Sequence, residues 1–378
     1  MADFYSICAG VQPVQGKTNG RIKKSGAGSA AFHTPAVLIT IQEVQMIAEA
    51  VVATGPGQVG YRKVKIPDPG ADDVVIRLVH SWISNGTEGS FIRGERIGGD
   101  IPWRDGEPLP FPHVPGYQKV GVVEGVGKDV RDFREGDWVF GTISAVEGMF
   151  YATGGHVSPA VTHQSQVWKL PRPVSPLAVS GLVLTQVGCN CGMRPALQSG
   201  DRAVVIGDGL VGHWSAQTLA YRGARVMLVG RRQERLSLFE TGDEGRRVNS
   251  RKDDPLTMAR EWAPEGVQVL VDTVGSIAAV EAFYPVLRHD AHIVSAGFYG
   301  ANGKIDIQAM RLRELTLHTP SGWSKARMDT TLDLIEKGVL KTEPLITHRF
   351  RAQDAVEAYS LILFPREPAL GIVLDWQE

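Results

Sequence analysis

The sequence carries a run of closely spaced glycines, Gly207-Asp208-Gly209-Leu210-Val211-Gly212. It follows a buried-type strand predicted for residues 203–206 and precedes a helix predicted for residues 210–222. In that context the first glycine permits a tight turn, the second lets the backbone approach a ligand, and the third allows close packing of helix and strand. The free N–H groups of the helix then suit a pyrophosphate. We therefore predict a dinucleotide site at Gly207, Gly209, Leu210, Val211 and Gly212, the alternative being an ordinary glycine turn of an α/β protein.

Two arginines follow the next predicted strand, residues 224–229, in the segment Gly230-Arg231-Arg232. A site that prefers NAD places an Asp or Glu there, about twenty residues after the glycines, to bind the ribose hydroxyls. Guanidinium groups at Arg231 and Arg232 would instead suit a 2′-phosphate. We predict that NADP(H) is preferred over NAD(H), the alternative being that one or both arginines only cap a solvated helix.

The pattern of strands and helices predicts two domains around this site. Short β-branched runs bounded by Pro and Gly, at residues 48–52, 73–81, 119–126 and 138–143, indicate a small antiparallel barrel. From about residue 182 strands and helices alternate, which indicates a doubly wound parallel sheet. Strand character returns at residues 369–376, and we expect this tail to pair with the barrel.

The fold class is therefore α/β, with domain boundaries expected near residues 181 and 325. Residues 46–181 and 326–378 form the barrel domain in this interpretation, and residues 182–325 form the dinucleotide-binding domain. Residues 1–45 are rich in Gly, Ser, Ala and Lys, and Met46 is followed at once by a strand pattern. We interpret them as a disordered extension or a misassigned start, with an organelle-targeting segment as the alternative.

Composition excludes several classes of protein. The chain has 40 Lys and Arg against 41 Asp and Glu, without the basic excess of a nucleic-acid-binding protein. Its apolar runs end well short of the roughly 20 residues that span a bilayer. Its 3 cysteines form no disulfide framework, so nothing requires an oxidising compartment. We expect a cytoplasmic protein with no membrane or nucleic-acid partner.

Seven short segments, in this order, resemble the landmarks of the medium-chain dehydrogenase/reductase superfamily. They are Ile83 to Glu88 (ISNGTE), Pro115 to Gln118 (PGYQ), Gly136 to Val139 (GDWV), the glycine motif, Val271 to Gly275 (VDTVG), Ala296 to Phe298 (AGF) and Leu345 to His348 (LITH). The resemblance covers nearly everything from Met46 onward. It implies a GroES-like barrel domain beside a Rossmann domain, and hydride transfer to or from a nicotinamide cofactor.

The same resemblance implies that the catalytic zinc of the superfamily is missing. Its ligand positions correspond to Asn85, Tyr117 and Gly181, and the glutamate beside the histidine ligand has become Gln118. Zinc binds thiolate, imidazole or carboxylate, so an amide, a phenol and a glycine cannot replace the ligand set. The sequence has no cysteine between Asp100 and Leu184 to build the structural zinc lobe. We predict no metal.

Among zinc-lacking members, the sequence looks most like the hydroxyethyl-bacteriochlorophyllide dehydrogenases. The shared segments are Ser84 to Glu88, Pro115 to Gln118, Ala296 to Tyr299, Met310 to Glu314, Leu345 to His348 and Val373 to Trp376. The chain departs from that pattern at Gln118, in the insert-like residues 94–108 and at Gly230-Arg231-Arg232. These departures favour a sister subfamily with its own substrate.

Without zinc, hydrogen-bond donors must stabilise the oxyanion that develops on the substrate. By resemblance, Tyr117 stands near the hydride path, Asn85 is a further donor, and Glu88 relays a proton or orients Asn85. The alternatives are a packed aromatic ring for Tyr117 and a structurally paired carboxylate for Glu88. On the cofactor side, the resemblance places Thr185, Val274, Ala296, Gly297 and Phe298 close to the nicotinamide.

We therefore predict a zinc-independent NAD(P)-dependent oxidoreductase that interconverts a secondary alcohol and a ketone of a small molecule. Reduction of an enone or a quinone is the second interpretation, and a family member that binds the dinucleotide without catalysis is the third. We also expect a homodimer.

Overall fold

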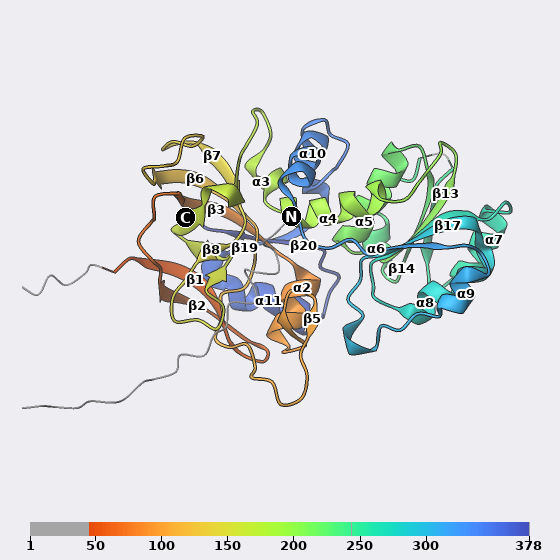
Figure 1. Ribbon diagram of the computed structural model, residues 1–378, viewed down its shortest axis with the longest axis horizontal. Coiled ribbons are helices and arrows are strands. Elements are labelled where there is room, and N and C mark those ends of the chain that lie inside the picture. Colours follow the sequence, from red (N-terminus) through yellow and green to blue (C-terminus); the bar gives the residue numbers. More distant parts are fainter. Residues whose placement is uncertain (1–44, 243, 378) are drawn as a thin grey trace, which may run out of the picture. The chain divides into compact units, whose positions relative to one another are not determined.

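The computed structural model describes residues 45–242 and 244–377 (Figure 1). Residues 46–378 make up one structural unit, and apart from Gln45 the predicted N-terminal extension lies outside the described residues. In the described part of the chain, no helix is long and apolar enough to cross a membrane.

The barrel half is built from short strands. They are β1 (Ile47–Gly55), β2 (Gln58–Lys65), β3 (Asp73–Ile83), β4 (Arg96–Gly98), β5 (Ile101–Pro102), β6 (Lys119–Val126), β7 (Trp138–Gly141), β8 (Ser144–Ala145), β9 (Thr153–Gly154), β10 (Val157–Ser158), β11 (Ala160–His163), β12 (Val167–Lys169), β19 (Ile346–Arg351) and β20 (Gly371–Asp375).

These strands form two main sheets. One has the order β10-β1-β2, and the other has the order β12-β7-β6-β3-β20-β19 with β11 added to β3. Three of the four strands expected from sequence fall within β1, β3 and β6, and the fourth, residues 138–143, extends two residues past the end of β7. Alternate apolar residues such as Val52, Ile66, Ile76 and Val139 point inward and build the barrel core.

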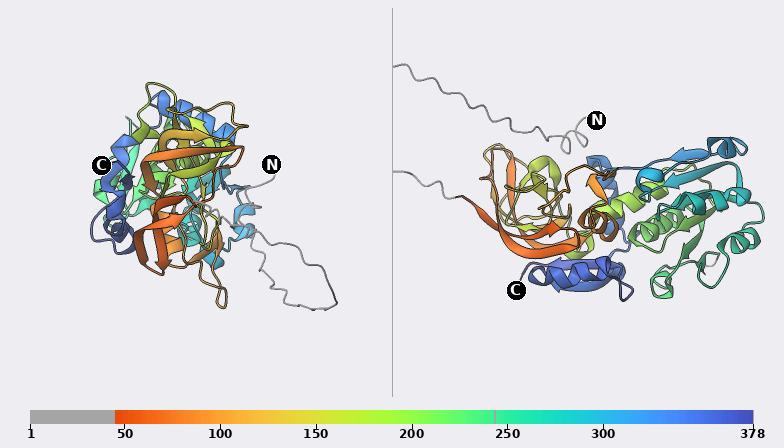
Figure 2. Two further views of the ribbon diagram at one scale, coloured as in Figure 1. Left: turned by 90° about the vertical axis from the view of Figure 1, so that its left-hand side faces the viewer. Right: turned by 90° about the horizontal axis from the view of Figure 1, so that it is seen from below.

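The C-terminal tail lies in the barrel half. β20 pairs antiparallel with β3, with Val373 opposite Trp82, and parallel with β19. The helix α11 (Ala355–Leu363) packs against β2 and β19 (Figure 2). This pairing joins residues 346–375 to the barrel strands, whereas residues 325–336 form a helix that packs on residues 176–193, and the expected boundary near residue 325 stays a prediction.

The second half is a six-stranded parallel sheet. Its strands are β13 (Arg202–Ile206), β14 (Arg225–Gly230), β15 (Arg246–Asn249), β16 (Val267–Asp272), β17 (Leu287–Ser295) and β18 (Thr316–His318). The order β15-β14-β13-β16-β17-β18 reverses direction between β13 and β16. This is the Rossmann order, in which ligands bind beyond the carboxyl ends of the strands at the reversal.

Helices connect and cover the strands. They are α2 (Asn85–Ile92), α3 (Pro176–Val179), α4 (Leu182–Met193), α5 (Leu210–Tyr221), α6 (Gln233–Leu236), α7 (Pro255–Trp262), α8 (Ile277–Ala282), α9 (Ile307–Arg311) and α10 (Lys325–Glu336). The helix predicted for residues 232–240 is shorter than expected. The N–H groups of Leu238 and Phe239 bond three residues back, and Phe239 turns into the core.

Candidate functional site

A cleft of about 570 Å³ lies at the carboxyl ends of the parallel strands, between them and the barrel half. Its volume is within the range of small-molecule and cofactor sites. The residues that line it are Ser84, Asn85, Gly86, Thr87, Ser90, Arg93, Glu95, Arg96, Leu184, Gly209, Leu210, Val211, Arg232, Arg235, Thr273, Val274, Ala296, Gly297, Phe298, Leu361, Ile362, Pro365, Ala369 and Leu370.

The glycine turn has three different environments. At Gly207 φ is +121°, and a Cβ there would lie 2.1 Å from the hydroxyl oxygen of Thr273. A Cβ at Gly212 would lie 1.9 Å from the carbonyl oxygen of Gly207. A Cβ at Gly209 would meet no atom of the described residues within 4 Å, because this glycine borders the cleft. Two glycines thus allow close packing, and the third leaves room for a ligand at the start of α5.

The loop after β14 is held by Asp208. One oxygen of its carboxylate accepts the backbone N–H groups of Arg231 at 2.7 Å and Arg232 at 2.8 Å. The other oxygen lies 3.5 Å from a guanidinium nitrogen of Arg235. Arg232 and Arg235 line the cleft, whereas Arg231 is exposed outside it. The predicted pair Arg231 and Arg232 is thus replaced in the cleft by Arg232 and Arg235.

The loops after β16 and β17 form the wall of the cleft. The buried carboxylate of Asp272 accepts the N–H groups of Val274 at 2.8 Å and Ser276 at 3.0 Å, and the hydroxyl of Tyr299 at 2.6 Å. This anchoring presents Val274, with 52% of its surface exposed, beside Ala296, Gly297 and Phe298.

Thr185 does not reach the cleft, contrary to expectation. Its hydroxyl donates to the carbonyl oxygen of Gly181 at 2.9 Å inside α4, and the residue is fully buried. Its neighbour Leu184 lines the cleft instead. Resemblance identified the right helix but not the residue that lines the cleft.

The polar floor of the cleft lies at the start of α2. The hydroxyl of Tyr117 donates to Oγ of Ser84 at 2.6 Å and makes a further side-chain hydrogen bond with Thr87. Burial raises the pKa of Tyr117 to about 12, so the phenol stays protonated and can act as a donor. Ser84 and Thr87, rather than the Tyr117 hydroxyl itself, line the cleft.

Asn85 lies beside them with one of its two N–H donors already used. Nδ2 donates to the carbonyl oxygen of Leu370 at 2.7 Å, whereas Oδ1 is buried and has no partner among the described residues. The amide therefore keeps one N–H of Nδ2 and the acceptor Oδ1, and the expected donor role of Asn85 stays a prediction.

Glu88 lies behind the floor and does not line the cleft. Its carboxylate accepts the N–H of Ser84 at 2.7 Å, contacts Nε2 of His156 at 3.0 Å and accepts the hydroxyl of Tyr359. His156 in turn contacts Oγ of Ser81 at 2.8 Å. Glu88 therefore fixes Ser84 and ties α2 to α11, and it makes no hydrogen bond to Asn85.

The positions of the superfamily's zinc ligands offer no suitable set of donors. Tyr117 stacks on Trp323 with ring centroids 6.1 Å apart, and a Cβ at Gly181 would lie 2.8 Å from the Trp82 ring. Gln118 bridges the carbonyl of Trp82 and the N–H of Leu184. In the described residues, no group of three or more His, Cys, Asp or Glu side chains could hold a metal ion. These side chains do not fit zinc.

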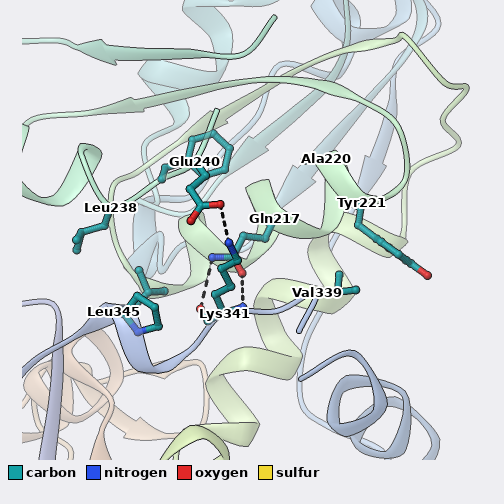
Figure 3. A pocket seen from close by; sticks show the side chains of 10 residues that line it. Gln217, Ala220, Tyr221, Leu238, Glu240, Val339, Lys341 and Leu345 are labelled. Carbon is teal, nitrogen blue, oxygen red and sulfur yellow. Dashed lines mark hydrogen bonds and ion pairs between the residues drawn. The ribbon is translucent and has the colours of Figure 1, made fainter. Parts of the chain in front are cut away.

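A second cavity, of about 270 Å³, shares no lining residue with the cleft. Figure 3 shows Lys341 pointing toward Glu240, with a 2.6 Å ion pair, while the Lys341 backbone bonds to Gln217. These contacts join α5 to the segment after α10, so we interpret this cavity as a packing junction.

Ser84, Thr87, Arg96 and Arg235 are among the cleft residues that were not predicted as site residues from the sequence. Ser84 and Thr87 lie in the ISNGTE segment, where Asn85 and Glu88 are the more obvious candidates for catalysis. Arg96 lies in the insert-like residues, and its burial has no signature in the local sequence.

The geometry is that of a two-domain dinucleotide-binding oxidoreductase. Residues 70–172 match the family model of the alcohol dehydrogenase GroES-like domain, and residues 211–337 match that of the zinc-binding dehydrogenases. The chain belongs to the medium-chain dehydrogenase/reductase family.

Individual relatives cover almost the whole chain. The 2-desacetyl-2-hydroxyethyl bacteriochlorophyllide A dehydrogenase of Rhodobacter capsulatus is 29% identical over 341 residues, which are 88% of this chain and 99% of the relative. A putative zinc-binding dehydrogenase of Sinorhizobium meliloti bound to NADP matches with a TM-score of 0.73 at 18% identity, over 88% of this chain and 100% of its own. The Escherichia coli short chain alcohol dehydrogenase rspB, complexed with NADH, matches with a TM-score of 0.74 at 22% identity, over 87% and 99%.

Proposed function

We propose that this protein is a zinc-independent, NADP(H)-dependent oxidoreductase that interconverts a secondary alcohol and a ketone. The observation that carries the proposal is the cleft itself, which is bordered both by the open face of Gly209 and by Ser84, whose Oγ accepts a hydrogen bond from the protonated Tyr117.

The chain's residues suit a dinucleotide. The N-terminus of α5 and the space over Gly209 would receive the pyrophosphate, and Arg232 and Arg235 would receive a 2′-phosphate. The loops at Val274 and at residues 296–298 would flank the nicotinamide ring. When bound, NADPH supplies the hydride.

The reaction also needs a proton donor for the substrate oxygen. The hydroxyl of Tyr117 donates a hydrogen bond to Oγ of Ser84 at 2.6 Å, which leaves the hydroxyl proton of Ser84 free to point into the cleft. A ketone oxygen that accepts this proton would be stabilised as negative charge develops on it. The free acceptor atom of Asn85 suits the hydroxyl of an alcohol substrate. Glu88 acts only through Ser84, whose position it fixes.

Zinc has no place in this proposal, because Asn85, Tyr117 and Gly181 lack the ligand atoms that hold it. The small-molecule substrate, the homodimer and the cytoplasmic location are further parts of the proposal.

Two measurements test this function. Calorimetry with NADPH and NADH should show binding of both, with NADPH tighter, and a panel of ketones should oxidise NADPH in protein purified with chelator. Tyr117→Phe should lower kcat and leave the Kd of NADPH unchanged. Loss of activity in chelator that zinc restores, or the absence of NADPH binding, would contradict the proposal.

A further inference from the structure

The cleft is lined by an arginine that has no role in the proposed dinucleotide site. Four arginines line it, Arg93, Arg96, Arg232 and Arg235, against a single acidic residue, Glu95. Arg93 and Glu95 neutralise each other, with guanidinium–carboxylate distances of 2.6 and 3.1 Å. Arg232 and Arg235 follow β14, where the adenosine end of the cofactor is proposed to bind. Arg96 is left without an assigned ligand.

We propose that Arg96 binds a carboxylate group of the substrate, so that the enzyme acts on hydroxy acids and keto acids. This inference rests on the proposed function and specifies the substrate class of the same cleft. Neither the family nor the hydride chemistry requires an anionic substrate.

The guanidinium of Arg96 has one edge occupied and one edge free. Nη1 donates to the carbonyl oxygen of Gly99 at 3.1 Å and to the carboxylate of Asp100 at 2.8 Å. Nε is buried and has no hydrogen-bond partner among the described residues. A buried unpaired donor is costly, and the Nε–Nη2 edge of a guanidinium matches the two oxygens of a carboxylate.

Packing holds this side chain in place. Arg96 is 5% exposed, and its guanidinium carbon lies 3.7 Å from the centroid of the Phe298 ring. Phe298 belongs to the wall proposed to flank the nicotinamide. A cation stacked on this ring is oriented before any ligand arrives, which lowers the entropic cost of binding.

Arg96 also lies near the proposed proton donor. Burial raises the pKa of Tyr117 to about 12, and the charge of Arg96 opposes this rise. The side chain of Asp100, in contrast, is 74% exposed on the outer side of the guanidinium. Water weakens this pair, so Asp100 only partly cancels the charge that Arg96 presents to the cleft.

The test compares three ketones as acid and methyl ester: pyruvate, levulinate and 4-acetylbenzoate. With NADPH, kcat/KM should be about 10- to 100-fold higher for the acid of at least one pair, as charge-assisted hydrogen bonds allow. Arg96→Met should lower kcat/KM for the acid far more than for its ester and so bring the ratio of the two close to one. Arg96→Lys, which keeps the charge but not the two-pronged edge, should retain part of the advantage of the acid. Asp100→Asn should increase the preference for the acid.

Equal rates for acid and ester in every pair of the unmodified protein would overturn the inference, as would equal losses for both in Arg96→Met. If Arg96→Met does not fold, Arg96→Lys and Asp100→Asn decide by the same comparison. Calorimetric titrations with NADPH and with 4-acetylbenzoate distinguish a failure of the proposed function from a failure of this inference. If NADPH does not bind, the proposed function is wrong. If NADPH binds but 4-acetylbenzoate does not, or binds equally well to Arg96→Met, only this inference is wrong.

Discussion

Replacing Gly209 with alanine should separate folding from cofactor binding. The backbone of Gly209 has φ −84° and ψ 176°, which alanine adopts without strain, and the added Cβ would meet no atom of the described residues within 4 Å. We expect Gly209→Ala to leave the free energy of unfolding unchanged or to raise it by about 0.4–1 kcal/mol, because the unfolded chain loses freedom.

Nucleotide binding should respond in the opposite direction. The methyl group would occupy the space proposed for the pyrophosphate and prevent charge-assisted hydrogen bonds from the start of α5. Each such bond contributes about 1.5–3 kcal/mol, so the Kd of NADPH should rise about 10- to 150-fold. Calorimetric titration measures the Kd, and urea unfolding measures the stability of the same preparation.

Two matched substitutions control this experiment. Gly60→Ala lies in β2, where the Cβ would make an ordinary 3.6 Å contact with Arg62, so it should affect stability as little as Gly209→Ala and leave the Kd of NADPH unchanged. Gly212→Ala would place a Cβ 1.9 Å from a backbone oxygen and should destabilise the fold by about 1–3 kcal/mol. A folded Gly209→Ala protein that binds NADPH as tightly as the unmodified chain would refute the reasoning.

Three further predictions concern charge and proton transfer. Arg235→Ala should weaken NADPH binding about tenfold more than NADH binding, whereas the exposed Arg231→Ala should not change their ratio; equal effects on both would argue against a 2′-phosphate at this loop. Tyr117→Phe should lower kcat by about 10- to 100-fold with little change in KM. Because the pKa of Tyr117 is about 12, kcat of the unmodified protein should show no ionisation of this group below about pH 11. An unchanged kcat in the variant would contradict a role for the hydrogen bond from Tyr117 to Ser84. Burial lowers the pKa of Lys119 to about 7, from the ordinary value of 10.5 that the unfolded chain keeps. Between pH 7 and pH 10.5 only the unfolded chain holds this proton. The free energy of unfolding should therefore rise with pH by up to about 1.4 kcal/mol per unit. Urea unfolding at several pH values should show that Lys119→Met loses this slope, and an identical slope in the variant would contradict the burial of a neutral lysine.

The fold was predictable because its signals are local. The glycine turn lies between β13 and α5 as expected, since strand, turn and helix all occur within about 20 residues of sequence. The reversal between β13 and β16 follows from alternating strands and helices. The end of α6 was missed because the burial of Phe239 depends on the core across the sheet, which no local pattern records.

The site was predictable only in part, because residue type does not reveal which atoms remain free after folding. Glu88 has the chemistry of a proton relay, but Ser84, His156 and Tyr359 occupy its oxygens. Asn85 was expected to donate, and its contact with Leu370, 285 positions away in sequence, already uses one of its two N–H groups. Such partners come from distant segments that only the folded chain brings together.

The same argument explains why Arg96 is the most informative residue of the cleft. An arginine in a Gly-rich insert is normally a solvated side chain, and the sequence around it indicates nothing else. The fold buries it against Phe298 at the lining of the cleft, where Nη1 bonds to Gly99 and Asp100 and Nε has no hydrogen-bond partner among the described residues. A guanidinium removed from water with unused donors is stabilised when an anion completes its hydrogen bonds, so the cleft is better suited to a carboxylate than to a neutral ligand.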